Sequence, residues 1–445
     1  MLAPAIWAAM VMSSSPWSRR ARADELIASG AAGGKLSMAR AEAIALAHQP
    51  AIVEAAGQTE ASEGRVEEAR AGYLPQAAIT GIYQRTTGNF APRPGGLPSN
   101  VAAASWASTT YNYFNFGASA SQLIYDFGQT NGRWRAAAAS RDAARENERT
   151  ARVQTLLGVR RAYLQARAQA ELAVVAEQTV TNQGRHVVQT QGFVRAGMRP
   201  DIDLARVRTD LANAKVQLVN ANNGLALARA TLNQAMGLPV NTRYDLAEED
   251  LPAVPGEDQS VDELITQAEK SRPELANLIE QRRAEELTVR ALKGGYGPAL
   301  SATAGATEAG IAIDGLVPNW YLGLTVSWPF LQGGLTRGQV REAYGTLRAL
   351  SASEAALRLQ VRIDVEQAQL GVMAAKSTIS AAGEALVNAR ELLRLAERRY
   401  ETGLGSAIEL GDAQVAATAA AAQEVTARFN LGTARAQLLA ALGVA

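Results

Sequence analysis

Hydrophobic residues recur at two different spacings along this chain of 445 residues. Helical spacing predicts helices over residues 37–71 and 261–293. Pro50 interrupts the first of these helices and Pro273 interrupts the second, because proline removes a backbone donor from a helix interior. Residues 260–263, Ser-Val-Asp-Glu, form a capping box that predicts the start of the second helix.

Two segments of the second half alternate apolar and polar residues instead, and two segments of the first half are their equivalents. From Pro298 onward every second residue is apolar, and the same alternation returns between Tyr321 and Phe330. We predict four strands, each with one apolar and one polar face, at about residues 77–85, 111–125, 299–308 and 320–331. A length of about 10 residues is typical of strands that span the wall of an outer-membrane barrel.

The helical pattern returns at Gly128 and at Gly334 and continues for about 65 residues each time. A second helix then runs back, with Leu at every seventh position from Leu204 to Leu232 and with Val or Ala three residues after each Leu. Sustained heptads with Ala at the d position predict coiled coils with closely spaced backbones. A helix of this length is roughly 100 Å long at 1.5 Å per residue, far longer than a globular domain requires.

The chain contains an internal duplication. Residues 225–237 recur as residues 431–443, at an offset of 431 − 225 = 206 residues. Upstream, residues 72–75 correspond to residues 295–298 at an offset of 223, so the first copy holds 223 − 206 = 17 extra residues. We expect these in the loop around residues 92–96, and we expect that loop to be extracellular because outer-membrane barrels keep their longer loops outside.

The predicted division of the chain follows the duplication. Residues 24–237 form the first structural repeat, residues 238–260 form a linker rich in Pro and acidic residues, and residues 261–443 form the second repeat. Residues 1–23 resemble a secretory signal peptide, with an apolar stretch from Leu2 to Met12 and small residues at the expected cleavage site. The alternative is a disordered tail or a misplaced start codon, since no Lys or Arg precedes the apolar stretch.

Composition removes several classes of function. With 44 Lys and Arg against 43 Asp and Glu, the formal charge is 44 − 43 = +1, which does not favour a nucleic-acid partner. Hydrophobic residues make up 47% of the chain, too many for a disordered protein. The longest apolar run, Leu2 to Met12, has 11 residues and is too short to span a bilayer as a helix, which excludes an inner-membrane helical bundle.

Little catalytic chemistry is available to the chain. It has no Cys, which excludes disulfides, thiolate nucleophiles and an acylated lipoprotein. Its two histidines, His48 and His186, lie 138 residues apart in helical stretches, and we expect both to be ordinary surface or packed residues. We therefore expect no catalytic residue, no cofactor, no metal site and no enzymatic activity.

Four strands cannot form a stable sheet alone in a membrane, because open edges leave backbone groups unpaired in hydrocarbon. A closed barrel needs about eight strands or more. Other chains must therefore complete the sheet, and three chains would give twelve strands. The chain is predicted to be an oligomer in contact with outer-membrane lipid.

The order of helix, strand hairpin, long helix, turn and returning helix, present twice, resembles the TolC family of outer-membrane channel proteins. The resemblance rests on this order and on short sequence motifs at residues 73–75, 296–298, 328–334, 400–403 and 408–413. The resemblance implies an α+β membrane protein in which duplicated helical hairpins and four strands per chain complete a 12-strand β-barrel and an α-helical tunnel as a homotrimer. It also implies location in the cell outer membrane with the tunnel in the periplasm, a periplasmic adaptor (membrane fusion) protein, and an inner-membrane RND or ABC transporter.

The resemblance also points to residues at the second helical turn. Family members carry acidic residues three apart that ring the periplasmic entrance, and Glu409 and Asp412 occupy those places here. The alternative is that Glu409 merely belongs to a capping box with Ser406. Asp203 and Tyr400 match the family's contacts between the two tips.

One position departs from the family pattern. An arginine that joins this network in the family is matched here by Gly405. The resemblance therefore leaves open how the closed state is held.

The leading functional hypothesis is a passive exit duct of a tripartite efflux system, which carries small toxic compounds and takes its energy from an inner-membrane pump. The chain has no nucleotide-binding or proton-relay motif of its own. Type I protein secretion uses the same kind of duct, and the sequence does not separate the two. A soluble coiled-coil scaffold would explain the heptads but not the four strands.

Overall fold

A computed structural model describes residues 35–87, 110–239, 242 and 244–444. The predicted signal peptide at residues 1–23 and the loop around residues 92–96 lie outside this part of the chain. Two compact units are present. Unit 1 consists of the described residues within Met1–Gly57, Glu146–Leu275 and Ala356–Ala445, and unit 2 consists of those within Gln58–Arg145 and Ala276–Ala355. Each unit takes segments from both sequence repeats, so the compact units differ from the division by repeats.

Each half of the chain begins with a broken helix. The first half has α2 (Met38–His48) and α3 (Pro50–Ala71), and the second has α6 (Val261–Ser271) and α7 (Pro273–Gly294). In both, the residue before the proline is extended and the proline opens the next helix, where its missing N–H is no loss. Ser260 caps α6 by accepting the Glu263 N–H, as the capping box predicts.

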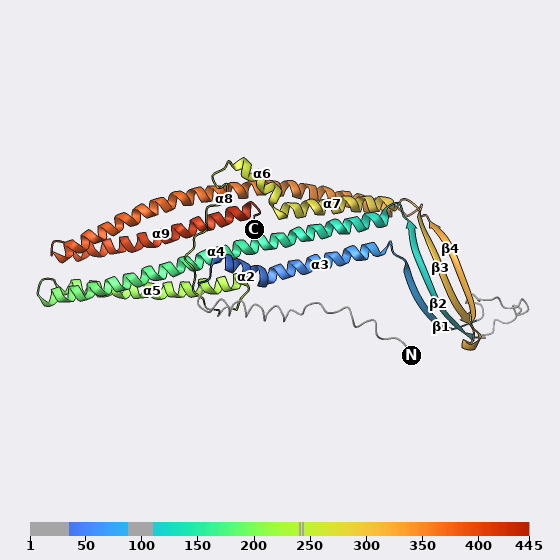
Figure 1. The fold of residues 1–445 in the computed structure, drawn as a ribbon, viewed down its shortest axis with the longest axis horizontal. Coiled ribbons are helices and arrows are strands. Elements are labelled where there is room, and N and C mark those ends of the chain that lie inside the picture. Colours follow the sequence, from blue (N-terminus) through green and yellow to red (C-terminus); the bar gives the residue numbers. More distant parts are fainter. Residues whose placement is uncertain (1–34, 88–109, 240–241, 243, 445) are drawn as a thin grey trace, which may run out of the picture. The chain divides into compact units, whose positions relative to one another are not determined.

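The long helices match the two heptad segments (Figure 1). They are α4 (Gln129–Arg195) and α5 (Asp201–Met236) in the first half, and α8 (Leu335–Glu401) and α9 (Ala407–Ala441) in the second. Both α4 and α8 have 67 residues, close to the 65 predicted. None of the helices in the described part of the chain combines the length and apolarity required to cross a bilayer.

Unit 2 contains one antiparallel sheet of four strands in the order β1-β2-β3-β4. The strands are β1 (Gln76–Thr87), β2 (Thr110–Tyr125), β3 (Ala299–Gly310) and β4 (Val317–Ser327), with a short 3-10 helix (Ile313–Gly315) before β4. The fourth strand lies a few residues earlier than the predicted 320–331. It ends at Ser327 because Pro329 has no N–H to offer the ladder.

The strand register places apolar and polar residues on opposite faces of the sheet. One row across the four strands is Ile79, Ala118, Ala306 and Trp320, and the adjacent row on the other face is Thr80, Gly117, Thr307 and Asn319. The Ile79 and Trp320 side chains are 90% and 82% exposed, although both are apolar. A large apolar sheet face without cover is typical of a strand wall that faces lipid.

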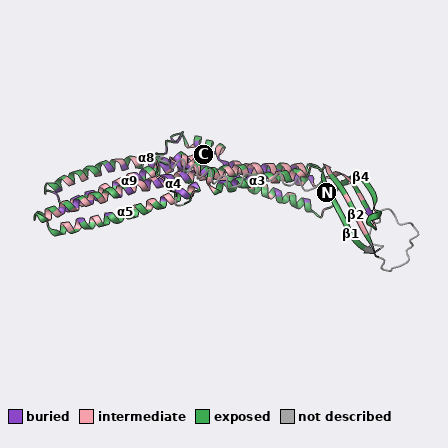
Figure 2. Cartoon of the chain, turned by 60° about the horizontal axis from the view of Figure 1, so that its bottom comes forward, coloured by how far each residue is buried: buried purple, intermediate pink, exposed green. Residues whose placement is uncertain are grey.

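Heptad positions form the inner faces of the helices in unit 1. Along α5 the Leu and the following Val or Ala positions are all buried or half-buried, whereas most of the residues between them are exposed. The equivalent positions of α9 are buried or half-buried as well. Figure 2 shows the resulting alternation of buried, intermediate and exposed residues along these helices. The predicted coiled-coil seams are therefore the packed faces.

The linker is fastened to the helices of unit 1 by polar contacts. The Tyr163 hydroxyl lies 2.9 Å from the Leu36 carbonyl and 3.0 Å from the Ala247 carbonyl. Glu257, 5% exposed, pairs with Arg435 and with Lys376 at 2.7 Å. Burial alone would raise the pKa of Glu257, but hydrogen bonds from Arg435, Lys376 and the Val254 N–H together lower it to about 2. The Glu257 carboxylate is therefore charged and fully paired at neutral pH.

Candidate functional site

The turns that join α4 to α5 and α8 to α9 are equivalent by sequence and by backbone. Gly197 ends the first long helix with φ +68°, and Gly403 ends the second with φ +77°, at an offset of 403 − 197 = 206 residues. In each turn the next residue donates its N–H to a carbonyl five residues earlier, Met198 to Phe193 and Leu404 to Arg399. Glycine suits this left-handed helix end because it has no Cβ. We call these turns the first tip and the second tip.

The four residues predicted from the resemblance all lie at or near these tips. Glu409 and Asp412 belong to the first two turns of α9, Tyr400 to the last turn of α8, and Asp203 to the first turn of α5. The 206-residue offset makes Asp203 the counterpart of Glu409 and Arg206 the counterpart of Asp412. The second tip thus carries two acidic residues where the first carries one acid and one base.

Tyr400 contacts the first tip through its whole side chain. It is 1% exposed, and its hydroxyl lies 2.9 Å from the Thr190 hydroxyl oxygen on α4. The Phe193 ring meets the Tyr400 ring edge to face with centroids 6.0 Å apart. The Arg199 guanidinium lies over the Tyr400 ring at 4.9 Å from its centroid. Tyr400 therefore ties the end of α8 to the end of α4 within one chain.

Arg199 makes a second contact between the tips. Its Nη2 donates to the Gly405 carbonyl at 2.6 Å. Gly405 is buried, and a Cβ there would lie 3.0 Å from both the Arg399 carbonyl carbon and the Tyr400 nitrogen. The second tip can fold this tightly because residue 405 has no side chain. Arg199 and Gly405 are also repeat counterparts, since 405 − 199 = 206.

The predicted entrance residues differ in their surroundings. The Glu409 N–H is capped by Ser406 at 3.1 Å, and the Glu409 carboxylate pairs with Arg399 at 3.1 Å. The Glu409 and Arg399 side chains are 39% and 58% exposed, so this ion pair is well hydrated and weak. Asp412 is exposed. Within the part of the chain that the structure describes, Asp412 has no ion-pair partner.

Asp203 and Tyr400 are not brought together by hydrogen bonding in a single chain. The Tyr400 hydroxyl is taken by Thr190. Asp203 is half-buried in the first turn of α5, and its side chain has no hydrogen-bond or ion-pair partner among the described residues. The Asp203 carboxylate is thus left available to a group outside the chain.

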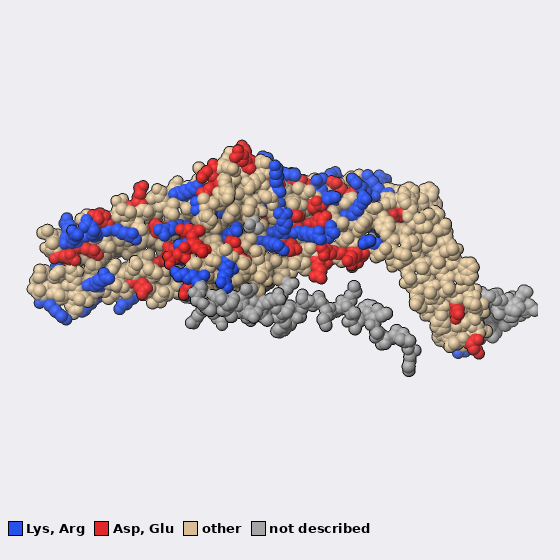
Figure 3. Space-filling view, in the orientation of Figure 1, with Lys and Arg blue, Asp and Glu red and all other residues tan. Residues whose placement is uncertain are grey.

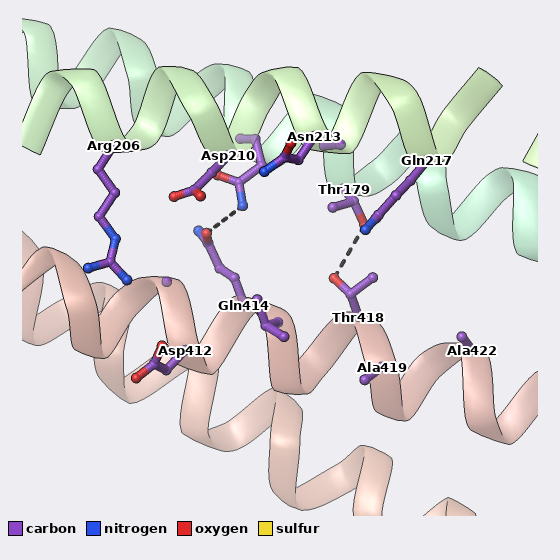
Figure 4. A pocket seen from close by; sticks show the side chains of 14 residues that line it. Thr179, Arg206, Asp210, Asn213, Gln217, Asp412, Gln414, Thr418, Ala419 and Ala422 are labelled. Atoms are coloured by element: carbon purple, nitrogen blue, oxygen red, sulfur yellow. Dashed lines mark hydrogen bonds between the residues drawn. The ribbon is translucent and has the colours of Figure 1, made fainter. Parts of the chain in front are cut away.

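A polar groove lies between the two hairpins behind the tips (Figure 4). It has a volume of about 360 Å³ and is lined by α4, α5 and α9. Gln183 donates to Gln414 at 2.8 Å across it, and the Thr179 and Thr418 hydroxyls lie 3.3 Å apart. Arg206 reaches from α5 toward α9, beside Gly411 and Asp412 (Figure 4). Hydrogen bonds thus join the hairpins at this seam, in addition to the apolar cluster of the second tip that Phe193 packs against.

His186 lies one helical turn before Thr190 and faces α8. It is buried, and its Nε2 is 3.8 Å from a Glu397 carboxylate oxygen. Burial lowers the pKa of His186 below its ordinary value, while the carboxylates of Glu397 and Glu401 and a hydrogen bond with Gln189 partly oppose that shift and Arg185 adds to it. His186 is thus a packed residue, held neutral at pH 7.

The sequence did not predict the residues of the first tip that contact Tyr400. Thr190, Phe193 and Arg199 carry no motif, and their contacts with Tyr400 depend on how the two hairpins pack. The 206-residue offset was the available signal, because it relates Arg199 to Gly405. No cluster of three or more metal-binding side chains occurs within residues 35–87, 110–239 and 244–444.

Known proteins resemble this chain along most of its length. A family model described as outer membrane efflux protein matches residues 43–238 and 264–444. The chain is 25% identical over 415 residues to outer membrane protein TolC of Escherichia coli (strain K12), covering 88% of this chain and 79% of TolC. It is 24% identical over 382 residues to outer membrane efflux protein BepC of Brucella suis biovar 1 (strain 1330), covering 84% and 78%.

The fold is also that of solved channels. The outer-membrane channel OprN superposes with a TM-score of 0.78 at 17% sequence identity, covering 96% of this chain and 92% of OprN. The outer membrane protein VceC of Vibrio cholerae superposes with a TM-score of 0.78 at 15% identity, covering 92% of this chain and 96% of VceC. The predicted α+β channel fold is therefore confirmed.

Proposed function

Because this chain belongs to the outer membrane efflux protein family, whose members are outer-membrane channels, we propose that it is the exit duct of a tripartite efflux system for small toxic compounds. The single observation that carries the proposal is the duplicated fold. One chain combines a sheet that has an exposed apolar face with two long helical hairpins. The duct performs no chemical step and draws its energy from a partner.

The sheet supports assembly as a homotrimer. In one chain β1 and β4 each pair on one side only, so two open edges remain. Pairing β1 of one copy with β4 of the next closes twelve strands and leaves no edge in lipid. Light scattering of the detergent-extracted protein checks this assembly. A trimer is expected, and a stable folded monomer would contradict it.

The partners we propose are a periplasmic adaptor protein and an inner-membrane RND or ABC transporter. The long hairpins of unit 1 support this proposal, since they exceed what a membrane channel alone requires and present extended helical surfaces to other proteins. Their heptad faces are already packed, so partners would bind the exposed helix faces.

We place the entrance of the duct at the second tip. Three copies of Glu409 and Asp412 would direct six carboxylates at one axis, where they would attract multivalent cations. The exposure of Asp412 and the hydrated ion pair of Glu409 support this role. Tyr400 would hold the two tips of each chain together, and Asp203 would contact a neighbouring copy.

Single-channel recording separates an entrance ring from a simple helix cap. Glu409→Ala/Asp412→Ala should weaken cation preference and block by trivalent cations, with unchanged trimer yield. Glu366→Ala/Glu384→Ala removes the same charge from exposed positions of α8 and serves as the matched control. If Glu409 is only a cap, its loss costs about 1 kcal/mol of local helix stability and leaves selectivity unchanged.

A deletion strain tests the function itself. It should become sensitive to small toxic compounds, and the intact gene should restore resistance. The same cultures are assayed for proteins missing from the medium, which is the result that type I secretion would give. Unchanged drug sensitivity together with a missing secreted protein would replace efflux with secretion.

A further inference from the structure

Exposed aromatic side chains mark the end of the sheet from which the helices of unit 2 leave. They stand within a few residues of the strand ends and are at least half exposed: Tyr125, Phe127, Tyr296, Trp328 and Phe330. Aromatic girdles of this kind occur where a membrane protein passes from hydrocarbon into the headgroup region. They therefore locate the periplasmic boundary of the membrane on this chain.

Basic side chains follow directly beyond that boundary. The seven helical residues nearest the sheet in α3, α4, α7 and α8 contain eight cations and two anions, a net charge of 8 − 2 = +6. The cations, which we call the basic collar, are Arg65, Arg70, Arg133, Arg135, Arg290, Lys293, Arg337 and Arg341. Seven helical residues span about 10 Å. The collar therefore lies at the depth of lipid headgroups.

The strands themselves carry almost no charge. Arg85 and Glu308 are the only charged residues within β1 to β4 as the structure defines them, and both lie toward the far end of the sheet. Figure 3 shows Lys and Arg gathered over the ends of α7 and α8 beside the sheet, and a visible sheet face without charge until its far end. The nearly uncharged strands and the basic helix ends beside them together indicate that the basic collar lies at the membrane interface.

Two collar arginines share one groove. A Cβ on Gly132 would lie 2.7 Å from the Ala291 Cβ, so α4 and α7 touch at this point. Beside the contact is a groove of about 400 Å³, lined by Arg135 and Asp142 from α4 and by residues of α7 that include Arg290. The close approach of the two helices brings these cations to one site.

The carboxylates of this groove already have partners. Asp142 pairs with Arg141 at 2.7 Å, and Glu286 pairs with Arg282 at 2.6 Å. Among the described residues, neither Arg135 nor Arg290 forms an ion pair, and both are exposed. Two guanidinium groups are thus left without a counter-charge. Their planar donor arrays suit the oxygens of a phosphate group.

We propose that Arg135 and Arg290 bind the phosphate of an anionic phospholipid, such as phosphatidylglycerol, in the periplasmic leaflet of the outer membrane. A lipid is favoured over a soluble anion because the site lies just beyond the aromatic boundary, where phospholipid headgroups are concentrated. The apolar sheet face offers the acyl chains an adjoining surface. The proposal rests on the outer-membrane location and is independent of what the duct exports.

The test uses the purified, assembled full-length protein. Binding of phosphatidylglycerol and of phosphatidylcholine is measured by native mass spectrometry for the wild type and for Arg135→Gln/Arg290→Gln. The variant should bind phosphatidylglycerol roughly 30-fold more weakly, from about 1 kcal/mol for each cation lost, with phosphatidylcholine binding unchanged. Arg208→Gln/Lys215→Gln removes two exposed cations from α5 and should leave both affinities unchanged.

Two outcomes would overturn the proposal. Equal phosphatidylglycerol affinity in the variant and the wild type would show that the groove does not hold the headgroup. Glycerol phosphate that competes with the lipid at equal concentration would identify a site for soluble anions instead. Size-exclusion chromatography of every variant confirms that assembly is intact before binding is compared.

Discussion

The two hairpin tips share one backbone but differ in the side chains that it carries. Gly197 and Gly403 take the same left-handed conformation at equivalent positions. The side chains around them differ. The first tip has Arg199 where the second has Gly405, and it has Val194 where the second has Tyr400. The duplication preserved the turn while the contacts at each turn diverged.

These differences make the tips complementary to each other. The buried Tyr400 of the second tip contacts the Thr190 hydroxyl and the Arg199 guanidinium of the first. The same guanidinium donates to the Gly405 carbonyl of the second tip. Neither tip could make these contacts with a copy of itself. Divergence between the repeats thus produced a contact that holds the two hairpins of one chain together.

The largest effect is expected from Tyr400→Ala. The substitution removes a buried ring and leaves the Thr190 hydroxyl without its partner, at a cost of about 3–5 kcal/mol of local stability. Hydrogen exchange at the ends of α4 and α8 should accelerate accordingly. Val194→Ala alters the counterpart position, which is half-buried, and should change exchange far less. Equal acceleration in both variants would mean that the tips are not complementary.

A smaller effect is expected from Arg199→Gln. It removes a charge-assisted hydrogen bond to the Gly405 carbonyl and the cation over the Tyr400 ring, together about 2 kcal/mol. Hydrogen exchange in residues 402–406 reports the change. Arg195→Gln removes an exposed charge from the same tip and is the control. No difference between the two variants would remove Arg199 from the contact.

Acid should loosen the same contact through His186. Burial lowers the pKa of His186 in the folded chain, so the folded chain binds fewer protons than the unfolded chain as the pH falls below 6.5. The stability that neutral His186 contributes is therefore complete above pH 6.5 and is lost as the pH falls through the lowered pKa. Protection factors near Thr190, which correct for the intrinsic pH dependence of amide exchange, should therefore be lower at pH 5.5 than at pH 7.5. His186→Gln should abolish that difference, and a difference that persists would assign it to another group.

The smallest stability effect is expected from Arg399→Gln. The Arg399–Glu409 pair is exposed, and such pairs contribute about 0.2–1 kcal/mol. Its loss should nevertheless free the Glu409 carboxylate and tighten block by trivalent cations. Arg394→Gln, which breaks the exposed pair with Glu391 on the same helix, is the control. Weaker block in Arg399→Gln would contradict a place for Glu409 at the entrance.

Periodicity predicted the elements because each has one apolar face. The heptads from Leu204 to Leu232 and the alternation after Pro298 are local signals, and the structure confirms the helix and the strand that they indicate. The end of β4 was predicted too late, because the alternation continues through Trp328 and Phe330 although Pro329 stops the ladder.

The side-chain contacts of the tips were beyond such signals. The resemblance points to Tyr400, but its partner Thr190 lies 210 residues away along the chain and has no pattern of its own. Likewise, the sequence has Gly405 where the family has an arginine, whereas in the structure Arg199 reaches the Gly405 carbonyl from the other hairpin. Contacts of this kind depend on which hairpins pack together, which a single sequence does not encode locally.

Single-channel conductance in a planar bilayer tests most directly whether the tip contacts close an outer-membrane duct. We predict that the wild-type assembly shows a small conductance and that Tyr400→Ala/Arg199→Gln raises it several-fold, while block by trivalent cations remains. Trimer yield is measured in parallel to exclude misassembly. Conductance equal to the wild type, in a variant whose tips exchange hydrogen rapidly, would show that these contacts do not hold the duct closed.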